Sequence, residues 1–245
     1  MAADERLDLV RKFARAAQDL SRETSQERLQ RRVVELAVEA VEGVASAGVT
    51  VLGGAGRLRS VAFTDETVRK VDQAQAESGQ GPCLDAARSP GVVWIEDMAA
   101  ERRWPRFTPR ARRLGVGAMV SCGLPAGNGR NTFGALNLHA WTPGAIGPQA
   151  VEIAQVFATH AAIALRNVAL MESLRTAMHS RQRIGEATGI VLERHRTDSA
   201  QAFELLVSVS QNLNVKLRDL SEYVVLTGQD PLRIGPDDLP PGYLR

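Results

Sequence analysis

The hydrophobic pattern is most regular in the C-terminal part of the chain, between Pro148 and Thr227. From Ala154 onward, apolar residues recur at steps of three and four, which places them along one side of a helix. The first set is Ala154, Phe157, Ala161, Ala164, Val168 and Met171. The pattern resumes on a shifted face at Leu174, Met178, Ile184, Ala187 and Val191. The sequence therefore predicts one helix of about forty residues, long enough to connect two domains and to lie against a copy of itself.

Two shorter amphipathic helices are predicted after this long one. The first follows residues 197–199, which offer an N-cap, and the second ends at Gly228, shortly before Pro231. Their apolar residues are Ala202, Leu205, Leu206, Val209, Leu213, Leu217, Leu220, Val224 and Val225. Three such helices can bury their apolar faces only against one another, so the sequence predicts a compact three-helix bundle.

The N-terminal part of the chain predicts a different architecture, of the α+β class. Helices are expected over residues 4–20, from Thr24 to Gly43, over 65–77 and over 107–114. Short apolar runs predict strands over residues 48–52, 58–63, 92–95, 118–124 and 133–139. A turn at residues 126–129 makes the last two strands a hairpin. An antiparallel sheet flanked by helices is the economical packing of these elements.

Composition fits two modest domains. The chain has 245 residues, of which 44% are hydrophobic, and its formal net charge is +2. Charge alone therefore indicates no polyanionic partner. The sequence shows no N-terminal run of the signal-peptide type and no stretch of eighteen apolar residues. This pattern predicts a soluble, cytoplasmic protein without a membrane segment.

No residue pattern predicts catalysis, a metal site or a cofactor. The four histidines, His139, His160, His179 and His195, show no metal-ligand spacing, and neither do Cys83 and Cys122. Cys83 follows Gly81 and Pro82 at the start of a predicted short helix, where the helix dipole could lower the thiol pKa and allow redox sensing. Burial as a small apolar side chain is the favoured alternative. We expect no enzyme.

Several ordered motifs lie between Leu174 and Thr227. They are the run RQRIGEATGIVL at residues 181–192, the run AFELL at 202–206 and the run SQNLNVKLRDL at 210–220. Together they resemble an ANTAR domain, the three-helix RNA-binding output module of bacterial antitermination regulators. The resemblance implies that residues 169–228 bind two neighbouring stem-loops in a nascent transcript and so let transcription continue. Residues 229–245 are expected to form a C-terminal tail.

The candidate RNA contacts are basic residues of this region, namely Arg181, Arg183, Lys216 and Arg218. Each can also be read as a solvated surface charge. Between Arg175 and Tyr223 there are seven cations and six anions, a net charge of only +1. Thr188 and Val207 stand where the family commonly has basic residues. The alternative is therefore a bundle that keeps the ANTAR fold but docks to a protein, or serves only in dimerisation.

A second group of motifs lies upstream, between Leu29 and Arg166. It comprises GQGPCLDA at residues 79–86, VWIED at 93–97, RWP at 103–105 and FGALNL at 133–138. In this order the motifs resemble the GAF domain found before actinobacterial ANTAR modules. The resemblance implies a sensor domain over residues 24–168, preceded by a helix within 1–23. It also implies a cupped sheet face that can hold a small-molecule ligand, and dimerisation through flanking helices. The ligand is not identified.

The segment from Arg102 to Arg113 is the most basic in the chain. Its simplest interpretation is a solvated helix face. The alternative is an additional surface for phosphate groups or an acidic partner, which would compensate for the weak charge of the C-terminal bundle.

Overall fold

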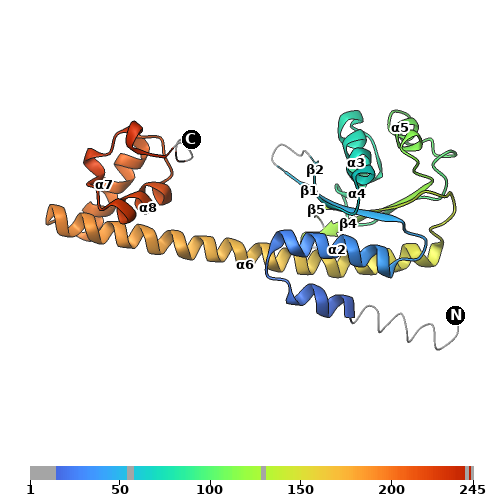
Figure 1. Cartoon of the computed structure of the whole chain (residues 1–245), viewed down its shortest axis with the longest axis horizontal. Coiled ribbons are helices and arrows are strands. Elements are labelled where there is room, and N and C mark those ends of the chain that lie inside the picture. The colour runs from blue at the N-terminus through green and yellow to red at the C-terminus, as the bar shows by residue number, and fades with distance from the viewer. Residues whose placement is uncertain (1–14, 54–57, 128–130, 241–242, 244–245) are drawn as a thin grey trace. The chain divides into compact units, whose positions relative to one another are not determined.

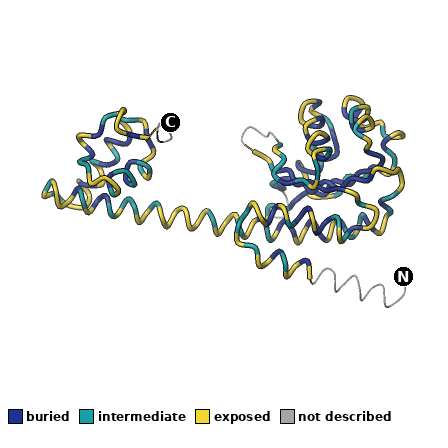
Figure 2. Tube along the Cα trace, viewed as in Figure 1, coloured by how far each residue is buried: buried dark blue, intermediate teal, exposed yellow. Residues whose placement is uncertain are grey.

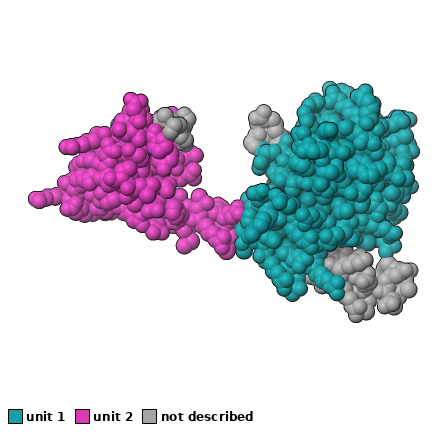
Figure 3. Space-filling view, viewed as in Figure 1, with its two compact units in different colours: residues 1–169 teal, residues 170–245 magenta. Residues whose placement is uncertain are grey.

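The structure is a computed structural model that describes residues 15–53, 58–127, 131–240 and 243. The chain divides into two compact units, residues 1–169 and residues 170–245 (Figure 3). The long helix α6 (Pro148–His195) has 48 residues and contributes to both units. Its start confirms the expected helix opening at Pro148, and the two units are described separately below.

Unit 1 contains a five-stranded antiparallel sheet in the order β2-β1-β5-β4-β3. Its strands are β1 (Ser46–Leu52), β2 (Leu58–Phe63), β3 (Val92–Ile95), β4 (Ala118–Pro125) and β5 (Thr132–Ala140). All five predicted strands are therefore confirmed. β4 and β5 pair from Ala118 with Ala140 to Pro125 with Thr132, as expected of the predicted hairpin. Residues 128–130 of its turn lie outside the described residues.

Helices cover both faces of this sheet (Figure 1). One face carries α2 (Gln26–Ala40) and the first part of α6, which share the main apolar core with the strands. The other face carries α3 (Glu66–Ser78), α4 (Pro82–Ala86) and α5 (Thr108–Arg113). Residues 15–22 are also helical and bury Ala16 and Leu20 in the main core, whereas the rest of the helix predicted over residues 4–20 lies outside the described residues. This arrangement confirms the α+β class.

Unit 2 is a helical bundle formed by the end of α6, α7 (Ser199–Asn212) and α8 (Leu217–Thr227). The Asp198 side chain caps α7 by accepting a hydrogen bond from the Gln201 amide at 2.8 Å, and Gly228 ends α8 with a φ of 64°. The core includes Ala187, Val191, Ala202, Leu206, Leu220 and Val224. Two short 3₁₀ turns follow, η2 (Pro231–Arg233) and η3 (Pro236–Asp238), and the expected tail adds buried Ile234 and Leu239 to this core.

The middle of α6 differs from the sequence prediction. Leu174 and Met178 were placed on one face with Ala187 and Val191, yet they are 51% and 71% exposed while Ala187 and Val191 are fully buried. At about 100° per residue, Leu174 and Val191 lie on different sides of the helix. Figure 2 shows this middle stretch as predominantly exposed. Sequence periodicity located apolar faces but could not distinguish a core face from an exposed one.

Length and composition alone would also allow α6 to cross a membrane, because it contains an 18-residue window of mean hydropathy 1.3. Only 33% of that window is buried in the structure. The apolar residues Ala154, Phe157 and Ala161, however, pack in the core of unit 1. Packing in the core of a folded domain therefore accounts for the apolar residues in this part of the helix.

Candidate nucleic-acid interface and sensor pocket

A polar groove of about 480 Å³ lies in unit 2 between α6 and α8. Its lining residues are Arg175, Thr176, His179, Ser180 and Arg183 from α6, and Arg218, Asp219 and Glu222 from α8. The spacing of the α6 residues, at steps of one, three and four, places them on one side of that helix. Three arginines against two carboxylates give the groove a small positive excess.

Two of the predicted RNA contacts, Arg183 and Arg218, line this groove. Each has an acidic neighbour on its own helix: Arg183 Nη1 lies 3.0 Å from Glu186 Oε2, and Arg218 Nε lies 3.0 Å from Asp219 Oδ1. Arg183 Nε is buried and has no hydrogen-bond partner among the described residues. The groove therefore contains one guanidinium N–H group that the described part of the protein leaves unsatisfied.

The other two predicted contacts, Arg181 and Lys216, do not line the groove. At about 100° per residue, Arg181 lies roughly 170° around α6 from the middle of the groove-lining set. Lys216 is exposed at the N-cap position of α8. A single groove in one chain therefore cannot use all four residues, and Arg181 belongs to a different surface.

Sequence reasoning missed Arg175 and His179 as members of the groove. Their signal was the spacing Arg175, His179, Arg183, because residues four apart follow one side of a helix. Thr188, which replaces a commonly basic residue, is 8% exposed and donates its hydroxyl proton to the Ile184 carbonyl at 2.7 Å. Thr188 thus has a structural partner and does not line the groove.

A second cavity, of about 440 Å³, lies in unit 1 on the face of the sheet that carries α3 and α4. It is lined by Thr50, Leu58, Ser60, Arg69, Asp72, Gln73, Ala76 and Cys83. Asp72 Oδ2 accepts a hydrogen bond from Ser60 at 3.0 Å, and Oδ1 accepts one from Asn137 Nδ2 at 3.1 Å. This is the polar, partly enclosed site expected of a sensor pocket.

Cys83 is part of the same polar network, which surrounds its buried thiol. Its Sγ lies 2.9 Å from Thr50 Oγ1 and 3.1 Å from Asn137 Nδ2. Burial, followed by the nearby charge of Asp72, raises its pKa to about 12. Cys122 is also buried and unpaired, and burial raises its pKa to about 12. A thiol pKa lowered by the helix dipole is therefore wrong for Cys83, because α4 has only five residues and desolvation dominates.

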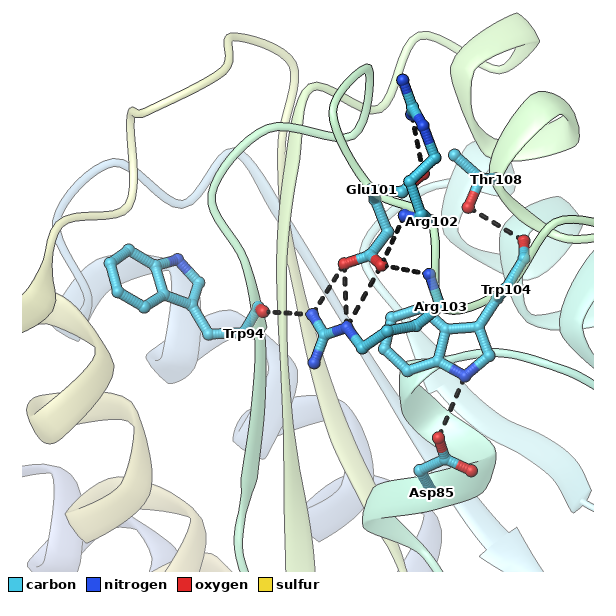
Figure 4. A network of polar contacts seen from close by, with 7 residues as sticks. All are labelled: Asp85, Trp94, Glu101, Arg102, Arg103, Trp104 and Thr108. Atoms are coloured by element: carbon cyan, nitrogen blue, oxygen red, sulfur yellow. Dashed lines mark hydrogen bonds and ion pairs between the residues drawn. The ribbon is translucent and has the colours of Figure 1, made fainter.

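Two arginines at the start of the basic segment in unit 1, Arg102 and Arg103, are held by contacts with their surroundings (Figure 4). Arg103 forms an ion pair with Glu101 at 2.7 Å, donates to the Trp94 carbonyl at 2.8 Å and stacks over Trp104, with its guanidinium carbon 4.4 Å from the ring centroid. Arg102 donates to the carbonyls of Ala99 and Glu101. This network fixes a loop, which favours a structural role for these two arginines over phosphate binding.

Trp104 anchors the same loop to α4. Its indole N–H donates to Asp85 Oδ2 at 2.9 Å, and its carbonyl accepts from the Thr108 hydroxyl at the same distance (Figure 4). Farther along, Arg110 pairs with Glu77 at 3.0 Å. Arg112 and Arg113 are exposed.

Comparison with known protein families matches both halves of the chain. Residues 23–166 match the GAF domain and residues 172–225 match the ANTAR domain. These matches define a regulatory protein in which a sensor domain precedes a small helical output domain. The chain belongs to the GAF family, whose match covers more than half of its residues, and it carries an ANTAR domain. Both are non-catalytic and typically soluble domains, and ANTAR domains are RNA-binding antiterminators.

Solved structures share the fold of unit 1. A domain of a protein assigned as a two-component sensor histidine kinase from Sinorhizobium meliloti 1021 has a TM-score of 0.51 at 14% identity, covering 61% of this chain and 96% of that one. The GAF domain of a protein assigned as a sensor histidine kinase from Pseudomonas syringae pv. tomato has a TM-score of 0.51 at 18% sequence identity, and the match covers 71% of this chain and 96% of that one. A bacteriophytochrome from R. palustris has a TM-score of 0.61 at 11% sequence identity, and the match covers 86% of this chain and 47% of that one.

These identities support the fold alone. Comparison with curated proteins finds no match.

Proposed function

We propose that this protein is a cytoplasmic, signal-responsive transcription antitermination regulator whose ANTAR bundle binds tandem stem-loops in nascent RNA. The observation that carries the proposal is the groove of unit 2, where Arg175, Arg183 and Arg218 meet on two helices of a domain whose family binds RNA. The GAF domain supplies the sensor, with a cavity that can hold a small molecule.

The chemistry of the groove suits RNA loops. A guanidinium can bind a phosphate through two N–H groups or stack on an unpaired base, and loops present both phosphates and unstacked bases. The hydroxyl groups of Thr176 and Ser180 can add hydrogen bonds to phosphates or to 2′-hydroxyls. The pairing of Arg218 with Asp219 is an exposed ion pair, worth at most about 1 kcal/mol, so a phosphate can replace it.

We further propose that the protein is a homodimer joined along α6. Val156, Ile163 and Leu170 are exposed and lie seven residues apart, which is the repeat of a two-stranded coiled coil. Leu174 and Arg181 follow on the same side of the helix, also seven residues apart. Arg181 therefore belongs to this dimer face, or to RNA bound across it, and not to the groove. Two copies of the bundle would match the two neighbouring stem-loops of the RNA.

Signal transfer in this proposal runs along α6. Ligand binding in the GAF domain would change the register of the two paired helices and so position or release the RNA-binding bundles. A shift of one helical turn between packed helices is a known two-state element. Cross-linking between the two copies of α6 tests this step: identical patterns with and without the activating signal would contradict it.

The test of the function is binding of the purified protein to a tandem stem-loop RNA at several salt concentrations. Affinity should fall steeply with salt, and Arg183→Ala and Arg218→Ala should each weaken binding and reduce the log–log salt slope by about one. Arg31→Ala, an exposed substitution on α2 in unit 1, is the matched control and should leave both unchanged.

Protein docking remains the alternative function, because Asp219 and Glu222 give the groove a mixed charge. RNA binding that is absent in the full chain but present in the 170–245 fragment would mean that the GAF domain inhibits the bundle. Absence of RNA binding in both would contradict the proposal and favour docking to a protein. Binding to a protein through apolar surfaces would depend little on salt concentration.

A further inference from the structure

The cavity of unit 1 contains a carboxyl group that lacks a cationic partner. Asp72, on α3, is 8% exposed, and among the residues that the structure describes only Ser60 and Asn137 donate hydrogen bonds to it. A carboxylate has about four acceptor positions, so about two remain free. No cationic side chain lies within 4.0 Å of Asp72 in the described part of the chain. Burial of such a group is unfavourable unless a charge or further donors compensate for the lost water.

The protein's own cation at this cavity is engaged elsewhere. Arg69 lines the cavity, but its Nε lies 2.7 Å from Glu66 Oε2 in an exposed ion pair. The other titratable group facing Asp72 is the Cys83 thiol of α4, which stays protonated because its pKa is raised to about 12. Ser60 from β2, Thr50 from β1 and Asn137 from β5 are uncharged. Nothing among these groups neutralises an ionised Asp72.

The shape and lining of the cavity indicate the rest of a ligand. A volume of about 440 Å³ falls in the range of small-molecule pockets. Leu58, Ala76 and the methyl group of Thr50 provide apolar surface beside the carboxyl group. This combination suits a compact apolar body that ends in a hydrogen-bond donor.

We propose that this cavity binds a small organic cation, with an aryl or alkyl body and a protonated amine that pairs with Asp72. This assignment names the ligand class for the sensor half of the proposed function, and it can be tested without RNA. Binding of such an amine should release the Asp72 proton to the buffer, and this release distinguishes it from binding of a neutral ligand. Burial raises the pKa of Asp72 to about 7, so the empty site holds its carboxyl group partly protonated at neutral pH. The carboxyl O–H bond then breaks as the ammonium N–H arrives, the proton leaves to the buffer, and the amine keeps its own proton.

The experiment is calorimetric titration of the full-length protein with matched probes. Tryptamine, tyramine and benzylamine are compared with their neutral analogues tryptophol, tyrosol and benzyl alcohol, in two buffers of different ionisation enthalpy. At least one amine should bind about tenfold or more tightly than its alcohol, as expected for a charge-assisted hydrogen bond in a buried site. Its binding should release about one proton per site at pH 6 and almost none at pH 8.5.

Two variants separate the pairing from the cavity. Asp72→Asn should reduce the preference for amine over alcohol to about one and abolish the proton release. Ala76→Trp should fill the cavity and abolish binding of both analogues while the Asp72 side chain is retained. Because Ala76 is exposed at the cavity, this variant remains informative if Asp72→Asn fails to fold. Glu77→Gln, the same change of acid to amide on the same helix but outside the cavity lining, is the control and should behave as the unsubstituted protein.

Four results would overturn the proposal. If none of the three amines binds saturably, the cavity is not a site for organic cations of this class. If each amine binds as tightly as its alcohol, the positive charge of the ligand is not required. Proton uptake in place of release would mean that the ligand accepts a hydrogen bond from a protonated Asp72. Tighter binding of indole-3-acetate than of tryptamine would instead assign the site to anions held by Arg69. Each of these results is independent of whether unit 2 binds RNA.

Discussion

Two exposed glycines inside α6 give the sharpest test of the proposed partner face of that helix. Gly185 and Gly189 have helical backbones, and a Cβ atom added at either position would meet nothing within 4 Å. The described structure therefore contains no packing reason for a glycine at either position. Gly185 lies seven residues after Met178, on the same side of α6 as the exposed residues Leu174 and Arg181. A close approach by a second chain or by RNA would explain both glycines.

The magnitude follows from helix propensity. Alanine in place of glycine in an exposed helix interior contributes about 1 kcal/mol, so Gly185→Ala with Gly189→Ala should raise the free energy of unfolding by about 1–2 kcal/mol. For a domain of the size of unit 2, each kcal/mol corresponds to about 4–8 °C in Tm. Thermal unfolding of the 170–245 fragment, which has its own core, measures this gain by circular dichroism. The full-length double variant should at the same time dimerise or bind RNA more weakly.

The control is Ser208→Ala, an exposed substitution on α7 that also raises helix propensity, though by less. It should stabilise the fragment without changing dimerisation or RNA binding. A fall in Tm for the glycine variant would show that the two added methyl groups meet atoms of the bundle. That result would contradict the open space around Gly185 and Gly189. A gain in Tm with unchanged sedimentation and unchanged RNA affinity would refute the interpretation of this face as a partner surface.

Three further predictions concern the cores and the sensor pocket. Leu206→Ala removes a fully buried side chain from the bundle and should lower the free energy of unfolding of the 170–245 fragment by about 2–5 kcal/mol in urea titration; a loss under 1 kcal/mol would contradict the core assignment. Trp104→Phe removes the hydrogen bond to Asp85 and part of a buried ring over which Arg103 stacks, and should cost unit 1 at least about 1 kcal/mol, measured by its thermal unfolding, with Trp141→Phe at an exposed position as the control. The raised pKa of Asp72 means that the folded state binds more protons than the unfolded state between about pH 4 and 7. Asp72 therefore makes the stability of unit 1 fall as pH rises through that window, whereas buried His139, whose pKa is lowered to about 4, makes it rise between about pH 4 and 6.5. The free energy of unfolding of the unsubstituted protein minus that of Asp72→Asn isolates the contribution of Asp72 and should fall across the window; a difference that rises would reverse the assigned sign.

Local sequence signals were sufficient for the elements and for part of the groove. The mainly apolar runs of β4 and β5 and the cap at Asp198 each depend on near neighbours in the chain, so these elements could be predicted. Arg183 and Arg218 could be proposed from the motifs that contain them. Their convergence on one groove could not, because it depends on how α8 packs against α6.

Asp72 shows why the sensor chemistry was not found in the sequence. It lies in a helix stretch that is rich in polar residues, and its spacing from Val68 and Gln75 gives only a weak sign of a buried face. Its unusual pKa results from desolvation, and desolvation arises only when α3, β2 and β5 enclose the carboxyl group. Tertiary burial, which no local pattern encodes, turns an ordinary aspartate into the most distinctive group of the pocket.

The exposed stretch of α6 connects the sensor and the output hypotheses in physical terms. Leu170, Leu174 and Met178 gain nothing from either core, and a helix segment without packed neighbours is only marginally stable in water. Pairing with a second copy would bury these side chains and stabilise the segment. Its stability and its register would then depend on the same contact, so a ligand that alters that contact can change the order of the segment and the presentation of the RNA groove together. A variant that places charge on this stripe, Leu174→Glu, should therefore weaken dimerisation and any ligand-dependent change in RNA affinity together. Loss of only one of the two would show that sensing does not act through the paired helices.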